Sequence, residues 1–180
     1  MSRRQDKKDD FAWGPPINLT AINSASSNDH GPWAFEGEDG ALTLYFMSNR
    51  AGGLGLFDIY ASTLADDGTF GPPVLVPELS SSASDVLPAV RRDGLEALIT
   101  SNRAGGQGLL DLWVATRAST SDPWSTPANL GPIVNSSANE QRSAISSDGR
   151  TIIFFSDRPG GFGAFDLYQS TRNKVKGADD

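Results

Sequence analysis

The hydrophobic positions of this chain come in short runs separated by glycine, proline and small polar residues. Three runs are clear, at 42–47, 95–100 and 151–155, and each follows an Asp-Gly pair and precedes a glycine-rich stretch. Runs this short, bounded by turn residues, predict β-strands and not helices. The last run, Thr-Ile-Ile-Phe-Phe, has no polar face, which is typical of a sheet packed between two others.

One phrase occurs three times, at 48–60, 101–113 and 156–168, with the pattern S-[N/D]-R-x-G-G-x-G-x-x-D-[L/I]-[Y/W]. Its aspartates, Asp58, Asp111 and Asp166, lie 53 and 55 residues apart. Self-similarity at such a period indicates stacked or radial repetition of one supersecondary unit.

Each repeat predicts the same four strands. The Asp-Gly pairs are Asp39-Gly40, Asp93-Gly94 and Asp148-Gly149, and each predicts a two-residue type I′ turn with positive φ at both central residues. The stretches before the pairs, 32–36, 88–92 and 143–147, are the expected innermost strands. An aromatic-x-x-Pro segment supplies the fourth strand, at Phe70–Pro73 and Trp124–Pro127, and its proline places that strand at an edge. The predicted fold is therefore an all-β propeller of four-stranded antiparallel meander blades.

A further aromatic-x-x-Pro segment, Trp13–Pro16, precedes the first hairpin, and the last repeat stops after its third strand. We therefore expect three blades over 11–172, with strand 11–19 completing the last blade of a partner chain, a disordered lead at 1–10 and a disordered tail at 173–180. Because propellers have about 4 to 8 blades, we hypothesise that two chains form a six-bladed homodimer. The alternative is a fragment of a longer propeller.

Composition and charge limit the partners and the chemistry expected of this chain. A net charge of −7 opposes nucleic-acid binding, which needs a basic face. The chain has no cysteine and one histidine, His30, which excludes thiol catalysis and a multi-histidine metal site within one chain. No apolar run approaches the roughly 18 residues of a membrane span, and the charged start does not predict a signal peptide.

The repeated phrase, with Asp-Gly and a strand before it, resembles the WD40-like PD40 repeat of TolB-type β-propellers over about 13–172. The resemblance implies a six-bladed ring, often in the bacterial cell envelope or periplasm and often used for protein contacts. The first repeat departs from the second at 30–33, where His-Gly-Pro-Trp stands in place of Val-Leu-Pro-Ala.

Two matched sets of residues are candidates for a site. Asp58, Asp111 and Asp166, with Arg50, Arg103 and Arg158, are expected to be structural, each aspartate accepting hydrogen bonds from its glycine-rich loop or pairing with an arginine. The alternative for this first set is ligand binding. Asp29, Asp85 and Glu140 stand just before the innermost strands, and in a six-bladed ring they would form an acidic collar able to hold Ca²⁺ or a basic peptide. The alternative for this second set is solvated acids that cap turns.

The expected function is a non-catalytic scaffold or binding module that uses the ring face or the central channel, with a protein, a small ligand or a cation as partner. The alternative is a hydrolase or lyase acting on a glycoside or peptide. Its site would be built at the channel mouth from Asp29, His30, Asp85 and Glu140.

Overall fold

The computed structural model describes residues 13–37 and 40–173, and these residues form three antiparallel sheets and no helix. The first sheet has the order β1 (Asp29–Glu36), β2 (Leu42–Ser48), β3 (Asp58–Thr63) and β4 (Val74–Leu75). The second has β5 (Asp85–Val90), β6 (Glu96–Ser101), β7 (Asp111–Thr116) and β8 (Ala128–Asn129). The third has β9 (Glu140–Ile145), β10 (Thr151–Ser156) and β11 (Asp166–Thr171).

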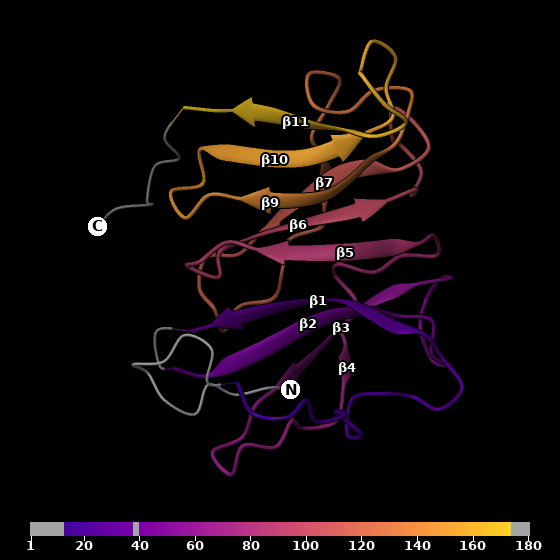
Figure 1. Cartoon of the computed structure of the whole chain (residues 1–180). Helices are drawn as coiled ribbons and strands as arrows, with labels where there is room; N and C mark the ends of the chain where they lie inside the picture. The colour runs from indigo at the N-terminus through magenta and orange to yellow at the C-terminus, as the bar shows by residue number, and fades with distance from the viewer. Residues whose placement is uncertain (1–12, 38–39, 174–180) are drawn as a thin grey trace.

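The sheets lie one after another, with the second between the first and the third (Figure 1). Contacts between the innermost strands run from β1 to β5 and from β5 to β9, as expected for blades around an axis. Among the described strands, none of the first sheet contacts one of the third. The predicted meander is confirmed, and the proline-containing segment does lead into the outermost strand of the first two sheets. Within 13–37 and 40–173 there is no helix long and apolar enough to cross a membrane.

The innermost strands share a β-bulge at one repeat position. The register shifts between His30 and Trp33 in β1 and between Val86 and Ala89 in β5. The residue at the bulge has a positive φ in all three strands: Gly31 at 65°, Leu87 at 54° and Arg142 at 48°. The last two are unusual because a Cβ is crowded in this conformation.

The type I′ prediction is wrong at the two Asp-Gly turns whose aspartate is described. Gly94 and Gly149 have φ of 75° and 66°, but Asp93 and Asp148 are not among the residues with positive φ. Gly94 N–H donates to the Arg91 carbonyl at 2.8 Å, so the glycine is the last residue of a four-residue turn. The aspartate carboxylate instead accepts the N–H two residues on, from Leu95 or Arg150, at 3.0 Å. Asp39 lies outside the described residues.

Apolar side chains fill the spaces between the sheets. The larger cluster joins Tyr45, Met47 and Ile59 of the first sheet to Ile99 and Trp113 of the second. A smaller cluster joins Leu112 of the second sheet to Phe154 of the third and to Val134 from the connection between them. The neighbouring residues Leu112 and Trp113 of β7 therefore face opposite sheets, as the period of a β-strand requires.

The segment before β1 lies against the outer face of the first sheet. Leu19 and Ile22 pack there with Phe46, Tyr60 and Phe70. Within the described residues β11 pairs with β10 alone, so the opening segment does not complete the third sheet of its own chain.

Candidate functional site at the inner strands

The matched arginines pair with the matched acids that precede the innermost strands. Arg50 Nη2 lies 2.6 Å from the Asp29 carboxylate, Arg103 Nη2 2.5 Å from Asp85, and Arg158 Nη2 3.0 Å from Glu140. The same nitrogen also donates to a carbonyl in the preceding connection: that of Ile22 at 2.7 Å, Leu79 at 2.9 Å and Val134 at 2.6 Å. We call each such arginine-acid pair, with its carbonyl, a bracket.

Two more repeat positions complete each bracket. The serine that ends the second strand accepts a hydrogen bond from the arginine Nε: Ser48 at 2.9 Å, Ser101 at 3.2 Å and Ser156 at 3.1 Å. The guanidinium also lies over the aromatic ring of the repeat phrase: Tyr60 at 4.9 Å, Trp113 at 5.4 Å and Tyr168 at 4.7 Å. The serine, arginine and aromatic positions of the phrase thus act as one unit that ties a connection to an innermost strand.

The first and third brackets hold their acids in the ionised form. Burial would raise the pKa of Glu140, but hydrogen bonds from Ser136 and Ser156 and the charge of Arg158 outweigh it, so the pKa lies below its ordinary value. The pKa of Asp29 is lowered in the same way, with burial opposed by Ser24, Ser48 and Arg50. Such groups are anions fixed in place, which suits structure better than proton transfer.

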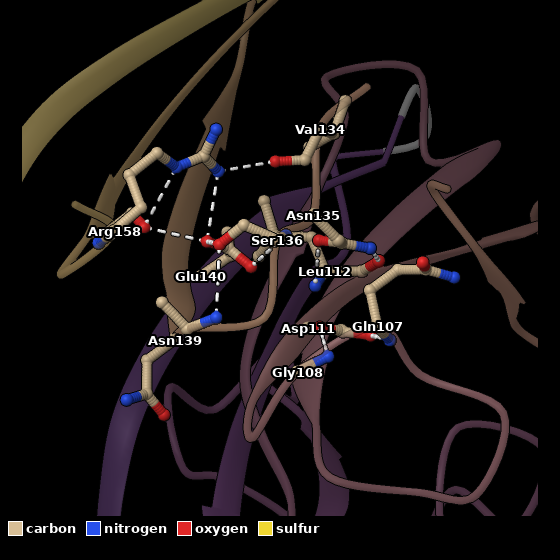
Figure 2. A network of polar contacts seen from close by, with 12 residues as sticks. Gln107, Gly108, Asp111, Leu112, Val134, Asn135, Ser136, Asn139, Glu140 and Arg158 are labelled. Atoms are coloured by element: carbon tan, nitrogen blue, oxygen red, sulfur yellow. Dashed lines mark hydrogen bonds and ion pairs between the residues drawn. The ribbon is translucent and has the colours of Figure 1, made fainter. Parts of the chain in front are cut away.

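The aspartates of the phrase fold the glycine-rich loops. Asp58 accepts the N–H groups of Leu54 and Gly55 at 2.9 and 3.1 Å. Asp111 accepts those of Gln107 and Gly108 (Figure 2), and Asp166 accepts those of Phe162 and Gly163. Of the two structural roles expected for these aspartates, the loop contact is the one present, and the arginine pairs with the other acid.

One buried carboxylate oxygen in this set has no partner among the described residues, Asp58 Oδ1. In the second repeat the Gly108 N–H donates to Asp111 Oδ1 at 3.1 Å, and the Asn129 side chain donates to the other oxygen, Oδ2, at 2.8 Å. In the first repeat both loop N–H groups donate to Asp58 Oδ2, which leaves Oδ1 without a partner. The orphaned oxygen therefore follows from the way this loop donates to a single oxygen and does not by itself mark a ligand site.

The acids predicted for the mouth of a six-bladed channel are each paired with an arginine of their own repeat. Asp29, Asp85 and Glu140 do occupy corresponding starts of β1, β5 and β9, but each is held in its own bracket, and Asp85 and Glu140 are fully buried. Among the described residues no three histidine, cysteine or acidic groups are placed to hold a metal ion. His30 is exposed and meets the edge of Phe57 with ring centroids 5.3 Å apart.

A cavity of about 800 Å³ opens at the other ends of the innermost strands. Its lining includes one set of equivalent residues with three different chemistries: Glu36, Arg92 and Ser147. Trp33 also lines it, with its indole N–H fixed on the Val90 carbonyl at 2.9 Å. Asp93 lies there too. Burial would raise its pKa, but hydrogen bonds from Arg91 and the Leu95 N–H outweigh burial and lower it.

Sequence reasoning noted Trp33 but not Glu36, Arg92 or Ser147. These three residues stand beside the Asp-Gly pairs, whose sequence signal concerns backbone conformation. The signal for the cavity is the contrast between the repeats at this single aligned position.

A scan of protein-family models finds no match to this chain, and a search of curated proteins finds none either. Solved structures similar to it include a thermostable family-43 glycoside hydrolase, at 15% identity with a TM-score of 0.59 over 89% of this chain and 59% of that one. An α-L-arabinofuranosidase from Lactobacillus brevis is 16% identical, with a TM-score of 0.58 over 92% and 58%. TolB from Acinetobacter baumannii is 17% identical, with a TM-score of 0.53 over 83% and 31%.

These neighbours are β-propellers, and together with the three meander sheets they make the fold of this chain that of a partial propeller. The chain spans less than two thirds of the length of each of them. At such identities the likeness establishes the fold alone.

Proposed function

We propose that this propeller binds a hydroxyl-rich ligand, such as an oligosaccharide, in the cavity at the ends of β1, β5 and β9, without turnover. The proposal rests on a contrast between two positions of the repeat, one matched in every copy and one that differs in each. The acids matched in every repeat are committed to brackets, whereas the cavity position carries a carboxylate, a guanidinium and a hydroxyl in turn.

The cavity has the chemistry that such a ligand needs. Its volume of about 800 Å³ lies within the usual range for ligand sites. Trp33 contributes an aromatic surface held by its hydrogen bond across the β1–β5 junction. Glu36 and Arg92 are exposed, so a carboxylate acceptor and a five-donor guanidinium can both meet sugar hydroxyls.

A second candidate is glycoside hydrolysis, and the neighbouring structures favour it over the non-catalytic role, since two of the three are glycosidases by name. Hydrolysis of this kind needs two carboxyl groups, one of them an acid with a raised pKa. The carboxyl groups that line the cavity are Glu36 and Asp93, and the pKa of Asp93 is lowered. The lowered pKa excludes Asp93 as that acid, so hydrolysis in this cavity would need Glu36 in the role.

Titration calorimetry and reducing-sugar release, run on the same arabino- and xylo-oligosaccharides, test the two candidates together. Binding that is lost in Glu36→Gln and Arg92→Gln but kept in Glu78→Gln, with no sugar release, is the expected result. Glu78 is a suitable control because it lies in the connection that follows β4, outside the cavity lining. Release abolished by Glu36→Gln would promote the hydrolase instead, and the absence of any binding would overturn both.

A further inference from the structure

One position of the repeat is buried in the first two sheets and exposed in the third. Ile59 in β3 and Leu112 in β7 are fully buried, at 0% exposure, while their equivalent in β11, Leu167, is 78% exposed. The first two are buried because the next sheet packs on them. The third sheet presents the same apolar face, with Ile153 and Phe165 also exposed, and no described residue covers it.

The chain contains a surface of the kind that covers Leu112. Leu112 packs in one cluster with five residues of the following unit: Leu130, Val134, Ile152, Phe154 and Tyr168. The first sheet and the segment before it hold the equivalents in one cluster: Leu19, Ile22, Leu44, Phe46 and Tyr60. That cluster contains no described residue from a preceding sheet, so it lacks only the counterpart of Leu112.

The opening segment also carries the polar groups that form the junction between the second and third sheets. Asn135 accepts the Leu112 N–H at 2.9 Å and donates to the Leu112 carbonyl at 3.0 Å (Figure 2). Its amide also donates to Asn129 Oδ1 at 2.9 Å, and in the opening segment Asn23 Nδ2 donates to Asn18 Oδ1 at the same distance of 2.9 Å. The Ile22 carbonyl is held by Arg50 as the Val134 carbonyl is held by Arg158, which fixes the equivalence of the two segments.

We propose that the exposed face and edge of β11 bind the opening segment and first sheet of a second copy of this chain. Asn23 of one copy then bonds the backbone of Leu167 in the other, and Asn18 meets Asp166 as Asn129 meets Asp111. The contact is head to tail, so two copies satisfy both faces of each other and close a ring of six blades. One copy gives three blades and three copies give nine, and both numbers lie outside the usual range of about 4 to 8. The inference concerns assembly and stands apart from the ligand of the cavity.

Mass in solution gives the first test. The full chain at about 10 μM should show twice its 19.1 kDa by light scattering. Leu167→Asp should dissociate the dimer at least about tenfold more readily, because a carboxylate would be buried in the contact. Leu109→Asp is the matched control, since Leu109 is 67% exposed on a loop of the second sheet outside this contact. A monomer for the unmodified chain overturns the proposal.

Cross-linking gives a second test that does not depend on the folding of Leu167→Asp. The chain has no cysteine, so single cysteines report contacts without background. In the first two sheets the outermost strand pairs Val74 with Ala61 and Ala128 with Val114. Ile17 is the equivalent of Val74 and Ala128, and Gln169 is the equivalent of Ala61 and Val114. In the proposed dimer, Ile17 of one copy should therefore face Gln169 of the other. Mild oxidation of mixed Ile17→Cys and Gln169→Cys chains should give a covalent dimer, whereas Leu109→Cys in place of Gln169→Cys should not.

The double variant Ile17→Cys/Gln169→Cys separates the possible occupants of the β11 edge. Two bonds joining two chains support the proposal. A monomer with an internal bond means that the chain's own opening segment covers β11. A monomer without a bond leaves that face to a different protein, and either monomer result overturns the proposal.

Discussion

The two junctions between sheets have the same geometry and different chemistry. At the first, Tyr45, Met47 and Ile59 pack against Ile99 and Trp113, and the Ser80 hydroxyl accepts the Ile59 N–H at 3.1 Å. At the second, the apolar cluster is smaller, and the side-chain amide of Asn135 takes the place of the serine at the backbone of Leu112.

Charge adds to the polar character of the second junction. Glu96 of β6 is buried between Arg91 of its own sheet, at 2.8 Å, and Arg172 beyond β11, at 2.5 Å. The equivalent position of the first sheet carries Thr43, which cannot form an ion pair. The repeat therefore determines which positions of neighbouring sheets come into contact. The residues at those positions determine whether apolar packing or polar contacts stabilise each junction.

The largest expected effect comes from removing the amide at the second junction. Asn135→Ala leaves the N–H and carbonyl of Leu112 and the Oδ1 of Asn129 without this partner, which should lower the free energy of unfolding by about 3 kcal/mol. Ser80→Ala at the first junction should cost about 1 kcal/mol, because one hydroxyl contact is lost. Urea unfolding of both variants gives the difference.

Equal costs for the two variants would mean that the amide is no stronger a link than the hydroxyl. The control is Asn139→Ala, which removes a solvent-exposed side-chain hydrogen bond to Asp157 of 2.9 Å. It should change stability by less than about 0.5 kcal/mol.

Acid should weaken the second junction through Glu140. The folded pKa of Glu140 is below the ordinary 4.5, so its stabilising contribution is complete above pH 4.5 and is lost as the pH falls through the folded pKa. Glu140→Gln should therefore cost about 2 kcal/mol near neutral pH and progressively less as the solution is made more acidic. Melting temperatures of the two proteins, measured from neutral pH down to about pH 3, follow this convergence.

A constant gap between the two melting curves across this range would show that Glu140 is not stabilised as an anion. Asp157→Asn is a useful comparison, because the pKa of Asp157 is lowered by Asn139 although the group is exposed. Its effect should be smaller at every pH, since an exposed group gains little from its partner.

Much of this architecture can be predicted from local sequence. The short runs at 42–47, 95–100 and 151–155 predict the central strands to within one residue, because strand length and turn composition are local properties. The prolines of the segments at 70–73 and 124–127 correctly predict the outermost strands of the first two sheets, because a residue without an N–H cannot serve a central ladder.

The site is harder to predict because it depends on where strands meet. The repeat phrase suggests Asp58 as the partner of Arg50, yet Arg50 binds Asp29, 21 residues upstream, since β1 and β2 pair antiparallel and bring Asp29 opposite Ser48. The register between β1 and β2 depends on strand pairing and on the bulge near His30, and local composition predicts neither. The cavity was missed for the same reason, because Glu36, Arg92 and Ser147 meet only when three strands converge.

The smallest expected effect lies at the bulge of β9 and has the opposite sign. Arg142 is exposed and has a φ of 48°, a conformation in which a Cβ is crowded, and the first repeat has glycine at this position. Arg142→Gly should raise the free energy of unfolding by about 0.5 kcal/mol, because relief of the crowding exceeds the added entropy of the unfolded chain. Leu87→Gly at the equivalent position of β5 should lower it, because Leu87 packs on the cluster of the first junction. Urea unfolding measures both, and a loss of stability in Arg142→Gly would show that the arginine contributes to the second junction more than its backbone conformation costs.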